Sequence, residues 1–283
     1  MATTPTSDLA GRSIFDCAVT GNIKVLSRLL TDELVNVCDQ FGDTPLHLAA
    51  RVGHYDVVAM LLGRGAQVNT SNLFNSSPLH EAVRGNQMMI IKLLLEVGAH
   101  VNVQDDNGNT PLYLACKNFD EEVLSLLLEY KSNPNLPNKA GKVPLHGAVC
   151  YNNAASISLL VSHGANINCK NNYGDTPLHT AAQMGRASVL KQMIRNGADI
   201  FISNYIGRNA LHTAAELCDE FSALKAVTSA LLNAGLPLDA CDLSEVTVLD
   251  IVKNKYDDET FQDYVGYCNH HAKLTKMSDS AKH

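Results

Sequence analysis

The chain of 283 residues is predicted to form an all-α repeat solenoid, built from stacked helix-turn-helix units rather than around one closed core. The first observation is a phrase of the type Thr-Pro-Leu-His that returns six times. Its leucines are spaced by 33 residues throughout, at Leu46, Leu79, Leu112, Leu145, Leu178 and Leu211. The second is that each phrase is a helix start. The third is that the units carry residues suited to ending two helices.

The first helix of a unit begins at the phrase. The hydroxyl of Thr44 can accept a hydrogen bond from a free backbone N–H, and Pro45 gives up a donor that has no partner in the first turn. Leu46, Ala49 and Ala50 share one helix face, and the small residues let neighbouring helices approach closely. We expect the first helices to end at residues that tolerate a left-handed conformation, namely Gly53, Asn86, Asn152 and Gly185.

The second helix is indicated by apolar runs such as residues 57–62 and 90–95, and it is predicted to end at a second glycine. Two units depart from this plan. In the unit 105–137, Tyr113 replaces the histidine, and Phe119 and Lys131 stand where the two helix-ending glycines are expected. A non-glycine residue in a left-handed conformation costs about 1 kcal/mol, so we expect this unit to be the softest. The last full unit has five extra residues within 217–228, predicted to lengthen its inter-helix turn.

The TPLHxA phrase and its period resemble the ankyrin repeat family over about residues 9–268. The resemblance implies β-hairpin fingers beside the first helices and one repeat domain over 9–271, with residues 1–8 and the polar tail 272–283 disordered. It also implies a degenerate first unit, six full repeats and a closing unit, with a further helix around 260–269 unassigned. These units are 9–38, then 39–71, 72–104, 105–137, 138–170, 171–203 and 204–241, then 242–271.

Composition excludes several classes of function. The net charge of −7 disfavours a nucleic-acid binder, which needs a basic face. There is no run of 18 apolar residues, which disfavours a membrane span, and no apolar stretch near Met1 that would indicate a secretory signal. The eight cysteines include no metal-type pair, and Cys17 and Cys116 occupy a slot held elsewhere by alanine. We therefore expect a reducing intracellular location, in the cytoplasm, the nucleus or both.

The recurring histidines invite a catalytic or metal-binding interpretation, and their regularity argues against it. They stand one residue after the core leucine, at His47, His80, His146, His179 and His212. We expect a ring nitrogen to bond the backbone of a neighbouring repeat, and copies about 10 Å apart are too distant to share one metal. The adjacent His270 and His271 have no further ligands nearby. No serine-hydrolase, zinc-protease or phosphate-loop motif is present. The chain is thus predicted to have no cofactor, metal or small-molecule substrate and to be no enzyme.

The predicted binding site consists of positions whose residues differ from repeat to repeat, in contrast to the recurring Leu, Pro, His and Gly that build the stack. The resemblance implies that finger tips and the exposed ends of first helices line a concave face. Several of these positions carry large apolar or basic side chains, which are typical of binding hot spots. They are Phe41, Arg51, Leu73, Phe74, Arg84, Lys117, Lys139, Lys142, Tyr151, Tyr173, Met184, Tyr205, Ile206 and Leu217. The alternative is that some of the aromatics only pack on the next finger and stiffen it.

The leading hypothesis is a protein-binding adaptor or scaffold, whose partner is a protein edge or an extended peptide that is apolar at one end and acidic in the middle. Within this class, a sequestering inhibitor of a transcription factor and a substrate receptor of a ubiquitin ligase complex both stay open. An enzyme built on the scaffold and a nucleic-acid binder are the alternatives from other classes. The resemblance also implies possible asparagine hydroxylation at Asn69, Asn102 or Asn168, residues that we expect to stabilise turns first.

Overall fold

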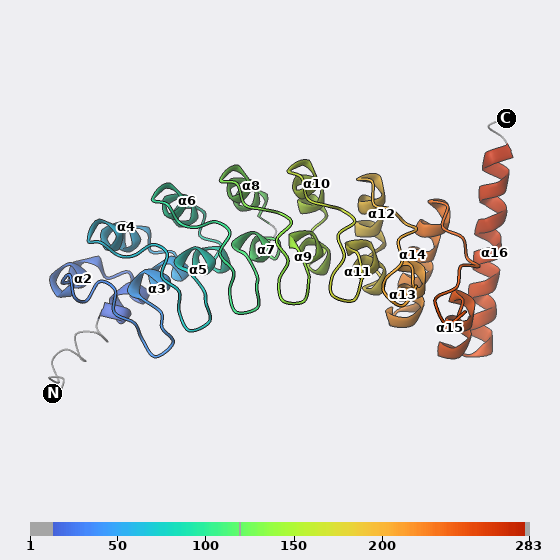
Figure 1. Ribbon diagram of the computed structural model, residues 1–283, viewed down its shortest axis with the longest axis horizontal. Coiled ribbons are helices and arrows are strands. Elements are labelled where there is room, and N and C mark those ends of the chain that lie inside the picture. Colours follow the sequence, from blue (N-terminus) through green and yellow to red (C-terminus); the bar gives the residue numbers. More distant parts are fainter. Residues whose placement is uncertain (1–13, 119, 281–283) are drawn as a thin grey trace. The chain divides into compact units, whose positions relative to one another are not determined.

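The computed structural model describes residues 14–118 and 120–280 (Figure 1). Regular structure in these ranges is helical, apart from one isolated bridge between Cys241 and Thr247. The chain divides into two compact units, residues 1–139 and 140–283, each of which is a stack of helix pairs. The predicted all-α repeat fold is therefore confirmed. The division falls within the repeat 138–170 of the single domain expected over 9–271.

In the first unit, residues 14–20 are helical and seven labelled helices follow. The first helices of the repeats, α3, α5 and α7, pack on one another in one row, and the second helices, α4, α6 and α8, form a second row (Figure 1). The bounds are α2 (Ile23–Leu29), α3 (Pro45–Val52), α4 (Tyr55–Gly63), α5 (Pro78–Arg84), α6 (Met88–Glu96), α7 (Pro111–Ala115) and α8 (Glu121–Glu129).

The second unit repeats the two rows with eight helices. The helices α9, α11, α13 and α15 pack in sequence, as do α10, α12, α14 and α16. Their bounds are α9 (Pro144–Cys150), α10 (Ala154–Ser162), α11 (Pro177–Gln183), α12 (Ala187–Arg195), α13 (Ala210–Leu217), α14 (Phe221–Asn233), α15 (Val248–Lys255) and α16 (Asp258–Ser280). In both units the core is formed by the phrase leucines, the small residues of the first helices and the apolar stripes of the second helices.

Four of the five phrase histidines tie their repeat to the next, as the sequence predicts, whereas the fifth, His212, bonds Asn209 of its own repeat and its buried Nε2 has no hydrogen-bond partner among the described residues. The backbone N–H of Thr44 donates to Nδ1 of His47 (3.1 Å), so Nε2 carries the proton and donates to the carbonyl of Ser76 (3.0 Å). His80, His146 and His179 bond carbonyls 29 residues ahead in the same way. Burial lowers the pKa of all of these imidazoles, and the pKa falls to about 4 for His80 and His146. The neutral rings therefore belong to the stack.

The predicted helix ends are confirmed by the backbone. Gly53, Asn86, Asn152 and Gly185 all have positive φ, and so do the second glycines of the repeats. Lys131 replaces one of these second glycines and adopts φ 65°, the left-handed conformation expected for it. Phe119, the other irregular residue of that unit, lies outside the described residues.

The fingers are tight turns and contain no strands in the described ranges, so the expected β-hairpin ladder is absent. In the first full repeat, the N–H of Asp39 bonds the carbonyl of Asp43 (3.0 Å), and its carboxylate accepts from the N–H groups of Phe41 and Asp43. The side chain thus occupies the turn, which is closed by one further backbone bond from the Gly42 N–H to the Asp39 carbonyl (3.0 Å). Each pair of neighbouring fingers is linked by a single backbone hydrogen bond, such as the one from the Tyr205 N–H to the Tyr173 carbonyl (3.2 Å).

Two further expectations need correction at the C-terminal end. The turn between α13 and α14 has three residues, as between α11 and α12, and the insertion instead lengthens α14 to 13 residues against nine in α12. The inserted segment has no Gly or Pro, and Phe221 at its start packs edge-on against Tyr256 (5.2 Å between ring centroids). The helix α16 runs to Ser280 through most of the tail predicted to be disordered, because that stretch also lacks helix breakers. Residues 1–8 and 281–283 lie outside the described ranges.

Candidate functional site

The second unit contains a groove of about 520 Å³ between its fingers and its first helices. The fingers that carry Tyr173 and Tyr205 form one wall of the groove. The helices α11 and α13 form the opposite wall and the floor. Five residues predicted to bind a partner line this groove, namely Lys142, Tyr173, Tyr205, Ile206 and Leu217. The structure therefore brings together residues that the sequence spreads over three repeats.

The apolar side chains of the groove lie along its rim and face solvent. Tyr173 is 72% exposed and Tyr205 63% exposed. Part of Tyr205 nevertheless packs on the preceding finger, since a Cβ added at Gly174 would lie 2.6 Å from the Tyr205 nitrogen and 2.8 Å from its ring. The expectation that aromatics stiffen the finger row thus holds for one edge of this ring. One face of the ring also meets the Lys170 ammonium, 5.6 Å from the ring centroid, and the remaining surface of the ring is exposed.

The floor of the groove is polar. Thr180 on α11 and Thr213 on α13 are buried and lie one residue after the stacking histidines. The Thr213 hydroxyl donates to the Asn209 carbonyl (3.2 Å), which leaves its lone pairs available to accept. The Thr180 hydroxyl and the Gln183 amide form no hydrogen bond with any described residue. The floor can therefore accept hydrogen bonds from a bound chain and donate to it.

Lys142, Asp175, Arg208 and Glu216 are the charged residues that line the groove, and the last two form an ion pair at its α13 end. Arg208 pairs with Glu216 and also with Asp242, from its Nε at 3.0 Å. The Lys255 ammonium also donates to the Glu216 backbone carbonyl (2.9 Å), so two cations and two carboxylates meet here. Of the pair that lines the groove, the Glu216 side chain is 43% exposed, against 17% for Arg208. Solvent at this end of the groove therefore meets the carboxylate more than the guanidinium.

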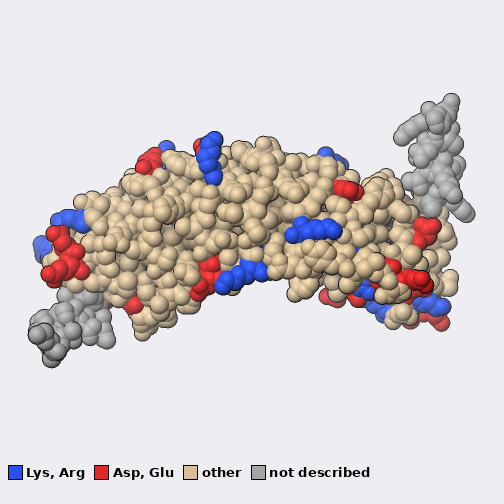
Figure 2. All heavy atoms as spheres, in the orientation of Figure 1, with Lys and Arg blue, Asp and Glu red and all other residues tan. Residues whose placement is uncertain are grey.

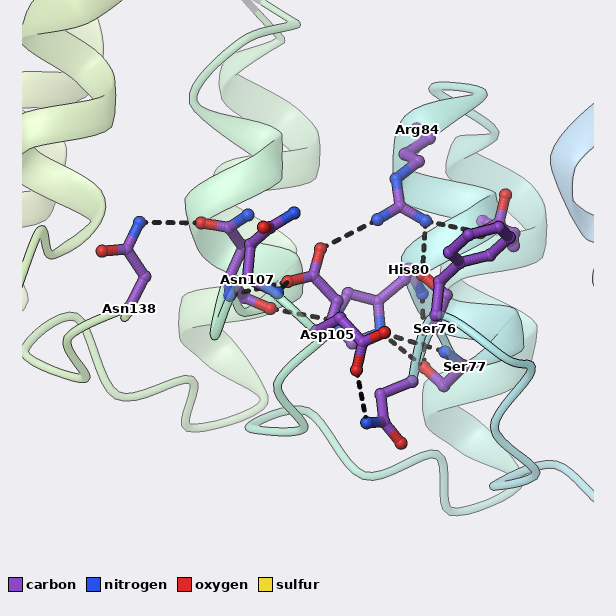
Figure 3. Close-up of polar contacts among 12 residues, drawn as sticks. Ser76, Ser77, His80, Arg84, Asp105, Asn107 and Asn138 are labelled. Carbon is purple, nitrogen blue, oxygen red and sulfur yellow. Dashed lines mark hydrogen bonds and ion pairs between the residues drawn. The ribbon is translucent and has the colours of Figure 1, made fainter. Parts of the chain in front are cut away.

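The first unit has its own exposed finger tips and a larger ionic network. Phe41, Leu73 and Phe74 are exposed at the tips, as predicted. Arg84 reaches from α5 to Ser76 on its own finger and to Asp105 on the next (2.9 Å to Oδ2), as Figure 3 shows. Arg84 also pairs with the buried Glu81.

Arg51 completes this network from the end of α3. It lies 3.7 Å from Asp43 and 3.6 Å from Glu81. Two arginines thus meet three buried carboxylates, Asp43, Glu81 and Asp105, and the sum is −1. The sequence predicts a basic strip of Arg84, Lys117, Lys139 and Lys142. Arg84 adds no net positive charge to this strip, because buried carboxylates neutralise it. On the face shown in Figure 2, Lys and Arg lie in small groups separated by uncharged surface and by Asp and Glu.

The remaining predicted residues lie outside the groove lining. Tyr151 and Met184 are exposed at the C-caps of α9 and α11. Lys117 and Lys139 are exposed in the first unit.

Thr180, Thr213 and Leu243 belong to the second unit's binding face and were not predicted. Thr180 and Thr213 could have been found by comparing the position after each histidine, where other repeats carry Leu48 or Gly147. Leu243, 77% exposed, occupies the finger position of Tyr205 in the closing unit, and its backbone bonds the carbonyl of Ile206 (3.2 Å). The five-residue insertion displaced the 33-residue register there, so the position was missed.

The asparagines considered for hydroxylation link consecutive repeats. Asn69 donates to the Gly98 carbonyl (3.1 Å) and accepts from the His100 N–H (2.8 Å). Asn102 makes the corresponding pair of bonds to Lys131 and Asn133, and Asn168 accepts from Asp199. The expected turn-stabilising role of these residues is confirmed.

Among residues 14–118 and 120–280 with described side chains, no group of three or more His, Cys, Asp or Glu residues is placed to hold a metal ion. A search of the described helices for a long, apolar membrane-crossing segment found none. The buried cysteines at 17 and 116 are core residues, as the sequence predicts.

Comparison with known proteins agrees with this geometry. A family model described as ankyrin repeats in three copies matches residues 79–171, 120–204 and 145–235, and a single ankyrin repeat model matches residues 41–73. The crystal structure of the human ASB11 ankyrin repeat domain is similar, with a TM-score of 0.67 and 27% sequence identity. The match covers 79% of this chain and 98% of that domain.

Proposed function

Because the chain belongs to the ankyrin repeat family, whose repeats generally mediate protein–protein interaction, we propose that it is a non-enzymatic scaffold that holds a partner protein in the groove of its second unit. The observation that carries the proposal is the rim of Tyr173, Tyr205, Ile206 and Leu217 over a polar floor. Large exposed apolar groups around a concave surface are typical of interaction sites and uncommon on an isolated monomer.

The apolar surface continues beyond the groove onto the last finger. The tips of Tyr173, Tyr205 and Leu243 are joined by the backbone bonds between neighbouring fingers. Rigid backbones keep these side chains in place before a partner arrives, so little conformational entropy is lost on binding. We therefore assign the finger tips and the groove to one binding face.

The test is affinity capture with the full chain and the double variant Tyr173→Ala/Tyr205→Ala. We expect the variant to lose its partner, because removing two hot-spot aromatics typically weakens binding by about 2 kcal/mol or more each. The matched control is Phe201→Ala, which removes an equally exposed aromatic, 63%, that does not line the groove. Equal capture by the double variant and the control would refute the proposal. A collapsed thermal melt of the double variant would assign the tyrosines to the stack instead.

The two narrower roles left open by the sequence make different predictions for the same capture. A sequestering inhibitor of a transcription factor recovers that factor and prevents it from binding DNA when the full chain is added. A substrate receptor recovers ubiquitin ligase subunits as well, and these stay bound when Tyr173 and Tyr205 are replaced. Comparing the proteins lost from the double variant with those retained therefore separates the two roles.

A further inference from the structure

We infer that the groove of the second unit binds its partner as an extended segment of about six residues, held through its main chain and carrying a basic side chain opposite Glu216. This inference rests on the proposed function and names the chemistry of the segment that the groove accepts. It follows from the floor, the length and the charge of the groove.

The floor favours an extended chain over a helix. A helix satisfies its own backbone hydrogen bonds and docks through an apolar stripe, which requires an apolar floor. Here the floor carries Thr180, Thr213 and Gln183. Thr180 is only 6% exposed, yet its hydroxyl has no hydrogen-bond partner among the described residues. This hydroxyl opens onto the groove, so an N–H or C=O group of a bound chain can pair with it in place of solvent.

The length of the groove sets the length of the segment. Its lining runs from Lys142 in the finger before α9 to Arg208 in the finger before α13, a distance of two repeats. Packed helices are about 10 Å apart, so two repeats span about 20 Å. An extended chain advances about 3.3 Å per residue, so about six residues fill this span. Alternate side chains of such a segment point toward the rim, where Tyr173, Tyr205 and Ile206 are exposed.

The charge at the α13 end selects a cation. Arg208 is already shared between Asp242 and Glu216, and Lys255 is held by backbone carbonyls, so the exposed Glu216 carboxylate is the charge that this end offers to a partner. A lysine or arginine of the segment can pair with this carboxylate, whereas an acidic side chain there would be repelled by it. The expectation of a partner with an acidic centre therefore does not extend to this end of the groove.

The experiment selects a displayed library of random 12-residue peptides against the full chain and measures the affinity of the enriched sequences. We expect apolar residues at alternate positions and one Lys or Arg at a fixed distance from them. N-methylation of single peptide amides should weaken binding about tenfold at alternate positions, because each methyl group removes one main-chain donor. Thr180→Val should weaken binding by a similar factor while leaving the melting temperature close to that of the wild type.

The basic residue is tested by a double-mutant cycle. Glu216→Gln and replacement of the peptide's Lys or Arg by Gln should each weaken binding about fivefold, and the two changes together should weaken it no further than either alone. Glu259→Gln, which neutralises an exposed carboxylate on α16, is the control and should leave the affinity unchanged.

The outcomes separate the two proposals. Peptides that lose affinity with Tyr205→Ala but tolerate N-methylation at every position, or that give an additive cycle, overturn the present inference and leave the groove as the docking site. If no enriched peptide responds to Tyr205→Ala more than to Phe201→Ala, the groove is not the docking site and both proposals fail.

Discussion

Acid should loosen the stack through its histidines, and His80 allows the effect to be isolated. Burial lowers the pKa of His80 from an ordinary value of 6.5 to about 4. The unfolded chain therefore binds a proton between pH 6.5 and 4 that the folded chain does not bind. The stabilisation from the neutral ring is fully present above pH 6.5 and is lost as the pH falls through this window. The shift corresponds to about 3 kcal/mol in total, of which about 2 kcal/mol is lost between pH 7 and pH 5.

The assay compares urea denaturation of the wild type and His80→Gln at pH 7 and pH 5. The variant loses the bond to the Asn109 carbonyl and is less stable at pH 7. The difference in unfolding free energy between the two proteins should shrink by about 2 kcal/mol at pH 5, because only the wild type loses the histidine contribution. Carboxylates titrate in both proteins and cancel. His100→Gln, at an exposed histidine, is the control. A His80→Gln difference that is the same at both pH values would refute the reasoning.

Three further predictions concern the frame of the stack. Arg84→Ala should destabilise the first unit by about 3 kcal/mol, because it leaves the carboxylate of Asp105 buried and unpaired; adding Asp105→Asn should recover most of the loss in chemical denaturation. Lys131→Gly should stabilise the chain by about 1 kcal/mol, since it removes the strain of a left-handed non-glycine residue. The backbone amides of residues 105–137 should then exchange hydrogen more slowly than in the wild type. Unchanged exchange rates would contradict the prediction that this repeat is the softest. Gly174→Ala should lower the melting temperature more than Gly197→Ala, because both positions have positive φ but only the first has a neighbouring finger within 4 Å.

The regular part of the fold could be predicted from the sequence because it depends on local chemistry. Helix starts such as Thr44-Pro45 and left-handed ends such as Gly53 are fixed by a few neighbouring residues, and both were confirmed. The sequence predicts that the insertion before Gly235 lengthens the inter-helix turn. Helix propensity alone does not decide whether extra residues extend a turn or the helix next to it. The position of the insertion in α14 is decided by tertiary packing, through the contacts of Phe221 with Tyr256 and α16.

The candidate site was only partly predictable, for a different reason. The family resemblance implies which positions of a repeat face the groove, and Tyr173, Tyr205 and Leu217, predicted from it, do line the groove. The sequence does not show which charges are already paired. Arg84 was counted as a free cation although it meets Asp105 from the next repeat, 21 residues away. Ion pairs between repeats depend on the side chains of two units at once, so they follow no single 33-residue pattern.

The residue at the base of each finger explains where those arginines are required. Its Oδ1 accepts two backbone N–H groups of its own turn whether it is Asn or Asp, as in Asn72 and Asp105. The second side-chain atom differs. In Asn72 it is an amide nitrogen that donates to Asp43 in the preceding finger (2.7 Å). In Asp105 it is an oxygen, which cannot donate and needs a donor from the preceding repeat, and Arg84 supplies it.

Asp242 and Arg208 repeat this arrangement in the second unit, through Nε of the arginine and Oδ2 of the aspartate. Where the finger base is a buried Asp, at Asp105 and Asp242, an arginine of the preceding repeat supplies the donor and is thereby used in the stack. Asp39 is a finger base that is only half-buried, and it forms no ion pair with an arginine of the described residues. The pairing with Asp242 occupies Arg208 at the edge of the groove and leaves Glu216 as the more exposed charge of its ion pair. The chemistry of the groove is thus set in part by the residue that holds the next finger in place.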